Sequence, residues 1–399
     1  MWYFYSPTIV FGPDSLDFLE NIKGNKIFIV TDPDLVKLKL VDIVTDKLKE
    51  LSKQYMIFSE VEPDPHEDTI IKGAEKCKEY APDLIIGFGG GSSMDTAKSI
   101  WAFYENDRPD FGVDDFHPFQ DLNLGRKAKM IAIPTTAGTG AETTWAVVIT
   151  RIKEDGTNIK LEQVNKELIP TYAIVDPVFT KGLPPKLTAA TGFDAVAHIL
   201  EGLISSWKND FSDALGIRAF DLIQKYLPRA YKDGSDEEAR EHMSNAATMA
   251  GLCFGNSQVI LGHSLGHVLG ATFHVPHGLA VGLFLPYVLQ YCLNDPENDE
   301  AKEILGRASK MVGLADWSDS DGAASKKLIQ GVKDLQKQVD FPQAIKEIGI
   351  SKEDFEAKLD FMGEMCLESG AGVMSPRSAD STMYKKLYQY AYDGKDVDF

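Results

Sequence analysis

The chain has 399 residues, which is too many for one ordinary hydrophobic core, so two domains are expected. Its 44% hydrophobic and 25% charged residues are typical of a globular protein and exclude long disorder. The formal net charge of -19 excludes nucleic acid and an anionic membrane surface as partners, because most of the protein surface would repel them.

The cysteines lie far apart and form no C-x-x-C pair: Cys77, Cys253, Cys292 and Cys366. This spacing disfavours a disulfide framework and a thiolate zinc site, and it suits a reducing cytoplasm. The first residues, MWYFYSPTIVFGPDS, lack the basic and apolar regions of a signal peptide, and they predict two short strands broken at Ser6-Pro7. No uncharged apolar run reaches the about 20 residues of a membrane span. We expect a cytoplasmic protein without a membrane segment.

Short apolar runs alternate with amphipathic segments along the first 180 or so residues. Strands are predicted at 26–32, 54–61, 83–91, 129–136 and 172–177. Helices are predicted at 35–51, 67–80 and 93–104. Near-continuous apolar strands separated by helices indicate a parallel sheet covered on both faces, as in an α/β domain.

The pattern changes at KGLPPKLTAATGFDA, where strand signals give way to helical periodicity. We place the domain boundary near Gly182, which gives an α/β domain over 1–182 and an all-helical domain over 183–399. Helices are predicted in the second domain at 187–205, 212–227, 236–253, 257–272, 278–292, 299–313, 323–339, 351–366 and 380–392.

The segment GFGGGSSMDTAK follows a predicted strand and opens a predicted helix. Glycines let the backbone approach a ligand closely, and the amides of Gly91, Ser92 and Ser93 would point from the helix N-terminus toward an anion. The segment is neither a G-x-G-x-x-G fingerprint nor a Walker A loop. Taken alone, it predicts either a phosphate-binding turn or a tight turn that serves packing only.

Two further strand ends favour the ligand-binding interpretation. Asp32 ends the strand KIFIVTD, where a carboxylate can accept from a ribose 2′-hydroxyl and would repel a 2′-phosphate, so NAD is favoured over NADP. The segment IPTTAGTGAE places a turn rich in glycine and threonine at another strand end. Ligands of open α/β sheets bind at the carboxyl ends of the strands, so these turns together predict a dinucleotide site.

Half of the eight histidines of the chain fall in the stretch GHSLGHVLGATFHVPHGLA: His263, His267, His274 and His277. On a helix, His263 and His267 project from one face because they are four residues apart. The stretch lacks the glutamate of H-E-x-x-H, which disfavours a zincin-type hydrolase. It predicts a metal site, with histidines that bind no metal as the alternative, and His274 is expected at the surface or in a loop.

An upstream segment, TGFDAVAHILEG, supplies Asp194 and His198 at the same four-residue spacing. An aspartate on the inner face of this apolar helix would be costly to bury unpaired, and a cation removes that cost. One carboxylate and three imidazoles suit Fe(II) or Zn(II) and leave positions open for a substrate oxygen: Asp194, His198, His263 and His277. His267 would then be a neighbouring or proton-relay group. Glu201 is expected either to orient His198 or to solvate the helix.

These segments resemble the iron-containing (group III) alcohol dehydrogenases, which include lactaldehyde, 1,3-propanediol and butanol dehydrogenases and the dehydrogenase part of bifunctional aldehyde-alcohol dehydrogenase. The resemblance rests on GGGSSMDTAK, TTAGTGAE, GFDAVAHILE and GHSLGHVLGATFHVPHG and covers nearly the whole chain. It implies a nucleotide-binding domain, a helical domain, a metal in the cleft between them and a homodimer formed through the N-terminal strands. The same four metal ligands follow from it.

The resemblance also assigns cofactor positions and leaves the substrate pocket open. The implied NAD-binding residues are Asp32, Gly90, Gly91, Ser92, Asp95, Thr135, Thr136, Thr139, Lys160 and Val178. His267 matches a histidine near the nicotinamide. The chain has AGVMSPR where many relatives have a T-x-x-N-P-R segment, so the pocket is expected to be lined by Trp145, Phe254, Val373 and Met374.

The expected reaction is hydride transfer between a small primary alcohol or diol and the nicotinamide of NAD, with Fe2+ or Zn2+ polarising the substrate oxygen. A glycerol-dehydrogenase-like zinc enzyme is the nearest alternative. A dehydroquinate-synthase-like lyase would need several Lys and Arg residues at the metal, and Lys160 is the main one offered. A non-catalytic metal protein would not need an adjacent nucleotide turn.

Overall fold

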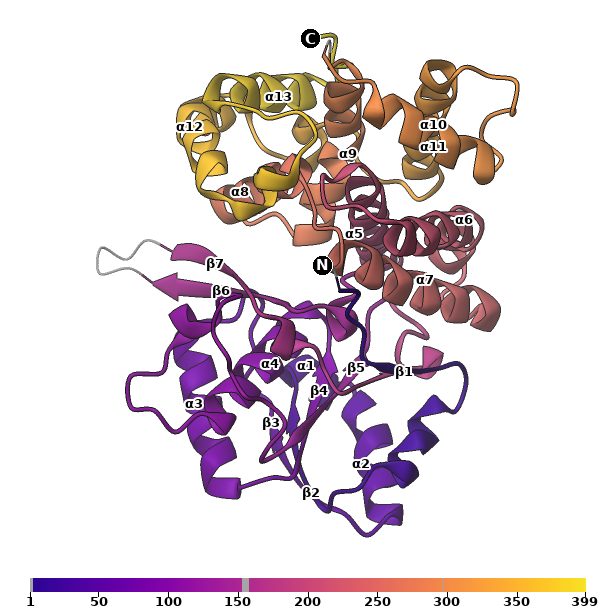
Figure 1. Cartoon of the computed structure of the whole chain (residues 1–399). Coiled ribbons are helices and arrows are strands. Elements are labelled where there is room, and N and C mark those ends of the chain that lie inside the picture. Colours follow the sequence, from indigo (N-terminus) through magenta and orange to yellow (C-terminus); the bar gives the residue numbers. More distant parts are fainter. Residues whose placement is uncertain (1–2, 153–157, 296) are drawn as a thin grey trace. The chain divides into compact units, whose positions relative to one another are not determined.

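The computed structural model of the chain describes residues 3–152, 158–295 and 297–399. The chain divides into two compact units, Met1–Lys181 and Gly182–Phe399, called unit 1 and unit 2 below. Each unit has its own secondary structure (Figure 1). Each also has its own set of buried side chains.

Unit 1 is built on a six-stranded sheet with the order β1-β8-β5-β4-β2-β3. Every neighbouring pair in this sheet is parallel, as predicted. The strands are β1 Thr8–Phe11, β2 Lys26–Val30, β3 Gln54–Phe58, β4 Leu84–Gly89, β5 Lys129–Pro134 and β8 Tyr172–Val175. After β3 the chain crosses back over β2 to form β4, so the direction of winding reverses between β2 and β4, the position where ligands of such sheets bind.

Alternating side chains of the strands are buried on both faces of this sheet. In β2, Phe28 and Val30 join one hydrophobic cluster, whereas Ile27 and Ile29 join another. The first cluster includes residues of α3 Glu67–Tyr80 and α4 Gly91–Glu105, and the second includes residues of α2 Leu40–Glu50. Helices therefore cover both faces, which explains the continuous apolar strand sequences (Figure 1).

Two local predictions in unit 1 were wrong, and one element was not predicted. The predicted helix at 35–51 is two helices, α1 Pro33–Lys37 and α2, because Lys39 between them has a φ of 60°. Two strands were expected in the first residues: β1 forms, whereas residues 3–7 are not in a strand, and residues 1 and 2 lie outside the described residues. Pro7 has no amide hydrogen to donate to a sheet. An antiparallel hairpin of β6 Ala146–Ile152 and β7 Asn158–Val164 was not predicted.

Unit 2 is helical, and each of the predicted helical segments forms a helix. These are α5 Pro185–Ile204, α6 Asp210–Lys232, α7 Glu237–Gly255, α8 Leu261–Phe273, α9 His277–Leu293, α10 Glu300–Met311, α11 Asp321–Gln338, α12 Lys352–Met365 and α13 Ser381–Asp393. Helix α5 packs against α6, α7 and α9, and α9 also packs against α8 (Figure 1).

Helix α5 is the core of unit 2. Among the described residues it is long and apolar enough to cross a bilayer by length and composition, yet 83% of that apolar window is buried inside the protein. Three ionisable side chains nevertheless lie on it and are buried: Asp194, His198 and Glu201. Since buried ionisable groups are costly unless they are paired or bind a metal, these side chains mark the helix as part of a site.

Candidate active site

Four metal-ligating side chains from three helices of unit 2 converge on one point. Asp194 and His198 lie one turn apart on α5, His263 lies in the first turn of α8, and His277 is the first residue of α9. Each can offer one ligand atom such that these atoms all lie within 4.8 Å of one another. The four residues that the sequence predicts as a metal-ligand set are thus brought together.

The distances within this cluster suit a shared cation. Asp194 Oδ1 lies 3.2 Å from His277 Nε2 and 3.7 Å from His198 Nε2. The rings of His198 and His263 are nearly parallel, with centroids 4.9 Å apart. Two imidazole nitrogens therefore lie near one carboxylate oxygen, and the four ligand atoms are close enough together to share one ion.

The polar atoms of the cluster fit a metal ion better than they fit one another. Asp194 and His198 are almost fully buried, and within the described residues neither Asp194 Oδ1 nor His198 Nδ1 makes a hydrogen bond of good geometry. Burial alone would raise the pKa of Asp194, but the neighbouring imidazoles hold this pKa below its usual range. Burial lowers the pKa of His198 to about 3, so this ring is neutral and the lone pair of its unprotonated nitrogen is available to a metal.

Glu201 does not take either of its expected roles, since it contacts His263 rather than His198 and is fully buried rather than solvated. Its Oε1 lies 3.1 Å from His263 Nδ1, and its Oε2 accepts a 2.7 Å hydrogen bond from the backbone N–H of Ile260. Burial raises the pKa of Glu201 to about 8, against the opposing effect of the Ile260 hydrogen bond. A cation in the cluster would favour the ionised carboxylate.

Two more side chains border the cluster. The ring of His267, one turn after His263 on α8, lies 5.7 Å from the ring of His263 and 5.0 Å from that of His277. Phe254, near the end of α7, stacks on the ring of His198 at 3.9 Å with an interplanar angle of 13°. His267 is thus close enough to act on a group bound at the cluster, and Phe254 covers one face of the His198 ring. The exposed His274 ends α8.

In unit 1, the predicted nucleotide turns meet at the carboxyl ends of neighbouring strands. Gly90 and Gly91 follow β4 and begin α4, and the threonine turn follows β5. A Cβ atom on Gly91 would lie 3.2 Å from Thr139 Cγ2, and one on Gly90 would lie 3.6 Å from Thr136 Cγ2. A side chain at Gly91 would crowd the threonine turn, whereas one at Gly90 would make an ordinary contact with it. The absence of both side chains leaves the α4 amides open to an anion.

Asp32 follows β2, the neighbour of β4, and caps α1: its Oδ1 accepts a 2.9 Å hydrogen bond from the backbone N–H of Leu35. Ser92 lies in the first turn of α4, beside the glycine turn, and Thr135 follows β5, where its backbone N–H donates to the carbonyl of Gly89. Val178 lies in the short 3-10 helix η5 Pro177–Phe179 after β8. These residues therefore lie at the carboxyl edge of one sheet.

The side chains of two other predicted cofactor residues bind to other residues of unit 1. Asp95 Oδ2 accepts a 2.9 Å hydrogen bond from the backbone N–H of Val148, and Lys160 Nζ forms a 2.6 Å ion pair with Asp64. Asp95 thereby ties α4 to strand β6. Lys160 lies on β7, in the hairpin that sequence patterns missed.

The predicted substrate-pocket residues fall in both units. Trp145 lies in unit 1 with its ring 6.2 Å from that of Tyr5. In unit 2, Val373 and Met374 lie in η8 Gly370–Met374, where Val373 is 72% exposed and the carbonyl of Met374 accepts from the backbone N–H of Ser206. Of these predicted residues, Phe254 is the one with a ring contact to the metal-ligand cluster.

Lys98 on α4 is a buried residue that the sequence reasoning missed. Its Nζ donates to the carbonyl oxygens of Thr144 (2.8 Å) and Ala146 (3.1 Å), just before and at the start of β6. Burial lowers the pKa of Lys98 to about 8. A lysine in the middle of a helix that is otherwise rich in small and apolar residues was the available signal.

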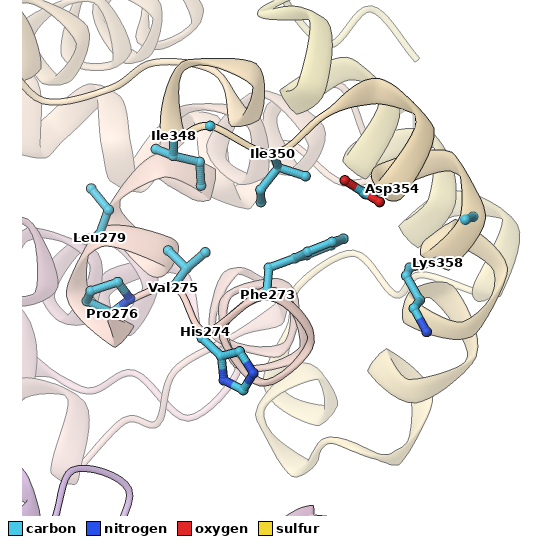
Figure 2. A pocket seen from close by; sticks show the side chains of 11 residues that line it. Phe273, His274, Val275, Pro276, Leu279, Ile348, Ile350, Asp354 and Lys358 are labelled. Atoms are coloured by element: carbon cyan, nitrogen blue, oxygen red, sulfur yellow. The ribbon is translucent and has the colours of Figure 1, made fainter.

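A cavity of about 510 Å³ lies beside the segment that leads to His277 (Figure 2). Phe273, Val275 and Pro276 line one side of it, and Asp354 and Lys358 of α12 line another. Figure 2 shows mostly apolar side chains around this space. No residue of the metal-ligand cluster lines it, so it is separate from the candidate active site.

Comparison with known proteins gives matches along almost the whole chain. The family model described as iron-containing alcohol dehydrogenase matches residues 6–177, and the model of the C-terminal region of that family matches residues 188–392. A NADPH-dependent butanol dehydrogenase from Clostridium saccharobutylicum is 37% identical, with 98% of both chains covered. A bifunctional aldehyde-alcohol dehydrogenase from Escherichia coli is 34% identical over 96% of this chain, which spans 45% of that relative. A solved structure of 1,3-propanediol oxidoreductase matches with a TM-score of 0.89 and 29% identity, covering 98% of this chain and 100% of that chain.

Proposed function

Because the chain belongs to the iron-containing alcohol dehydrogenase family, we propose that it transfers a hydride between a small primary alcohol or diol and NAD, using Fe2+ bound in unit 2. The family makes it an oxidoreductase that acts on CH–OH groups, with iron and a nicotinamide cofactor. The observation that carries the proposal is the convergence of one carboxylate and three imidazoles in a chain of this family.

The metal ligands in this proposal are Asp194, His198, His263 and His277. They present one negative charge and neutral rings, a set that also accepts Zn2+. When bound, the ion supplies Lewis acidity, which lowers the pKa of the alcohol hydroxyl or polarises the aldehyde carbonyl. Phe254 covers one face of His198 and so limits the approach of water from that side.

His267 is proposed as the catalytic group that moves the proton. It is partly exposed and lies beside both His263 and His277, so it connects the cluster with solvent. In alcohol oxidation it would accept the hydroxyl proton and pass it outward, and in aldehyde reduction it would return one.

Unit 1 is proposed to bind the dinucleotide. The α4 amides at Gly90, Gly91 and Ser92, with the threonine turn, would hold the pyrophosphate. The full proposed set is Asp32, Gly90, Gly91, Ser92, Asp95, Thr135, Thr136, Thr139, Lys160 and Val178. For Asp95 and Lys160, the hydrogen bond to Val148 and the ion pair with Asp64 support an indirect role, in which they hold the walls of the site.

We propose NAD rather than NADP as the cofactor, although one relative is named NADPH-dependent. The carboxylate of Asp32 ends β2 at the switch point of the sheet, and only one of its oxygens is used to cap α1. A second negative group at this position, such as a 2′-phosphate, would be repelled.

The substrate is proposed to be uncharged. The helical segments that carry the ligands, residues 188–204 and 257–293, contain no lysine or arginine. A phosphate or carboxylate group of a substrate would have no cationic partner on these segments, which disfavours the lyase alternative and favours a small alcohol or aldehyde. The residues proposed to line the substrate pocket are Phe254, Trp145, Val373 and Met374.

A homodimer and a cytoplasmic location complete the proposal. Strand β1 is an edge strand, and Phe11 on it is 65% exposed, which supports pairing with a second copy. The four cysteines are free and buried, which suits a reducing compartment.

The proposed activity is tested by metal analysis of anaerobically purified protein, followed by reduction of short aldehydes with NADH and with NADPH. We expect one ion per chain and turnover with NADH. Loss of both bound metal and turnover in His263→Ala would support the assignment, whereas a variant that keeps both would contradict it.

A further inference from the structure

We propose that Glu201 is a positioning residue of the metal centre: its carboxylate fixes the tautomer and orientation of His263 so that Nε2 faces the ion. The proposal rests on the proposed function, because it requires that the cluster binds a metal. It adds a fifth side chain to the site, one that the ligand pattern does not include.

The contacts of Glu201 link two helices at the ligand. The residue is fully buried, one turn after His198 on α5, and its two oxygens reach the start of α8. Oε2 accepts from the backbone N–H of Ile260, the N-cap residue of α8, and Oε1 lies 3.1 Å from His263 Nδ1. The carboxylate therefore holds the end of α8 and the ring of its ligand at once.

When an ion occupies the cluster, its positive charge favours the ionised form of Glu201, which can only accept hydrogen bonds, so the 3.1 Å contact then places the proton of His263 on Nδ1. The lone pair of a neutral ring is then on Nε2, the nitrogen left to coordinate a metal. A carboxylate behind a metal-bound histidine also increases the basicity of the ring. Charge, tautomer and ring orientation are thus set by one side chain.

Gly262 provides a second, independent observation. A Cβ atom at this position would lie 2.4 Å from Glu201 Oε1 and 3.0 Å from Glu201 Cδ. The carboxylate can reach His263 because the residue before that histidine has no side chain. An alanine at position 262 would push the carboxylate away without changing the chemistry of Glu201 or His263.

The test compares metal affinity with metal-free stability in four purified variants. In Glu201→Gln, an amide with one acceptor faces two donors, so either the Ile260 N–H loses its partner or His263 carries its proton on Nε2. Glu201→Asp keeps the charge but is one methylene shorter. Gly262→Ala displaces the carboxylate. Glu105→Gln is the matched control, because Glu105 is a buried carboxylate of unit 1 that accepts from the backbone N–H groups of Lys127 and Ala128.

Each chelator-treated protein is titrated with Zn2+, and with Fe2+ under anaerobic conditions, against a competing chromophoric chelator, and its unfolding is followed without metal. We expect Glu201→Gln, Glu201→Asp and Gly262→Ala to bind metal about 10- to 100-fold more weakly. The affinity of Glu105→Gln should be unchanged. Metal-free Glu201→Gln should unfold at about the same temperature as the unaltered protein, because an amide is easier to bury than a carboxylate.

Unchanged affinity in Glu201→Gln and Gly262→Ala would overturn the proposal. Full metal affinity in Glu201→Asp would also overturn it, because that result would show that the charge alone matters. A loss of metal affinity matched by an equal loss of metal-free stability would overturn it as well, because Glu201 would then only cap α8. Failure of the unaltered protein to bind metal would instead refute the proposed function.

Discussion

Replacing Asp194 with asparagine keeps the shape of the side chain and removes the only negative charge among the four ligands. All ligand atoms lie within 4.8 Å of one another, so an ion among them is a few ångströms from this carboxylate. At an effective dielectric constant of about 20, one pair of unit charges about 4 Å apart is worth about 4 kcal/mol. That energy corresponds to about a 1,000-fold loss of metal affinity, and a divalent ion should lose at least as much.

The assay is thermal unfolding with and without metal. At a free metal concentration of 100 times the dissociation constant, the ion stabilises the unaltered protein by about 2.7 kcal/mol. At the same concentration the weakened variant gains less than about 0.1 kcal/mol. For a unit of this size we expect a metal-induced rise in Tm of about 5 to 10 °C that is absent in Asp194→Asn.

The metal-free proteins provide the second comparison. Asp194 is buried and its carboxylate is costly to desolvate, so Asp194→Asn should be as stable as the unaltered protein, or more stable, when no metal is present. The control is Asp213→Asn on α6, a partly buried aspartate of unit 2 that is not part of the ligand cluster. A metal-induced rise in Tm that survives in Asp194→Asn would refute the reasoning.

Three further predictions address the other parts of the account. Replacing Asp32 with glycine should raise the ratio of kcat/KM with NADPH to kcat/KM with NADH at least about tenfold, because repulsion of the 2′-phosphate is removed; an unchanged ratio measured in steady-state assays would exclude Asp32 as the selector. His267→Ala should lower kcat about 100-fold while the metal content stays at one ion per chain, and His274→Ala, at the exposed end of α8, should change neither. Burial lowers the pKa of Lys98 to about 8 from an ordinary 10.5, so the unfolded chain binds more protons between these values and stability should rise with pH across that window, by up to about 3 kcal/mol. Chemical denaturation between pH 7 and 11 should show this rise in the unaltered protein relative to Lys98→Met, and parallel pH profiles would contradict it.

Local periodicity was enough to predict most elements of this fold. The helix at 67–80 begins and ends as predicted, because its apolar face and its flanking turn residues are encoded within the segment itself. The β6–β7 hairpin was missed because the apolar run of β6 is short and leads into Arg151, and because β7 has charged residues such as Lys160 between its apolar ones. The break between α1 and α2 depends on the left-handed backbone conformation of one residue, Lys39. Lysine has no particular preference for that conformation, so the sequence did not predict the break.

The metal-ligand cluster was predictable because a four-residue spacing places Asp194 and His198 on one face of a helix, and because His263 and His277 fall in one short histidine-rich stretch. The partner of Glu201 was not predictable in the same way. The glutamate is separated from His263 by 62 positions, and which ring it meets depends on how α5 and α8 approach each other. The same holds for Lys98, whose acceptors lie 46 and 48 positions further along the chain. The partners of such residues are set by long-range packing, so local sequence patterns do not predict them.

The central claim is that one divalent ion, held by Asp194, His198, His263 and His277, supports NADH-linked aldehyde reduction. The most direct measurement is a titration of chelator-treated protein with Fe2+ under anaerobic conditions, with turnover of a short aldehyde recorded at each point. The account predicts that activity rises linearly and stops at one ion per chain. Full turnover in the metal-free protein, or saturation without any gain in activity, would contradict it.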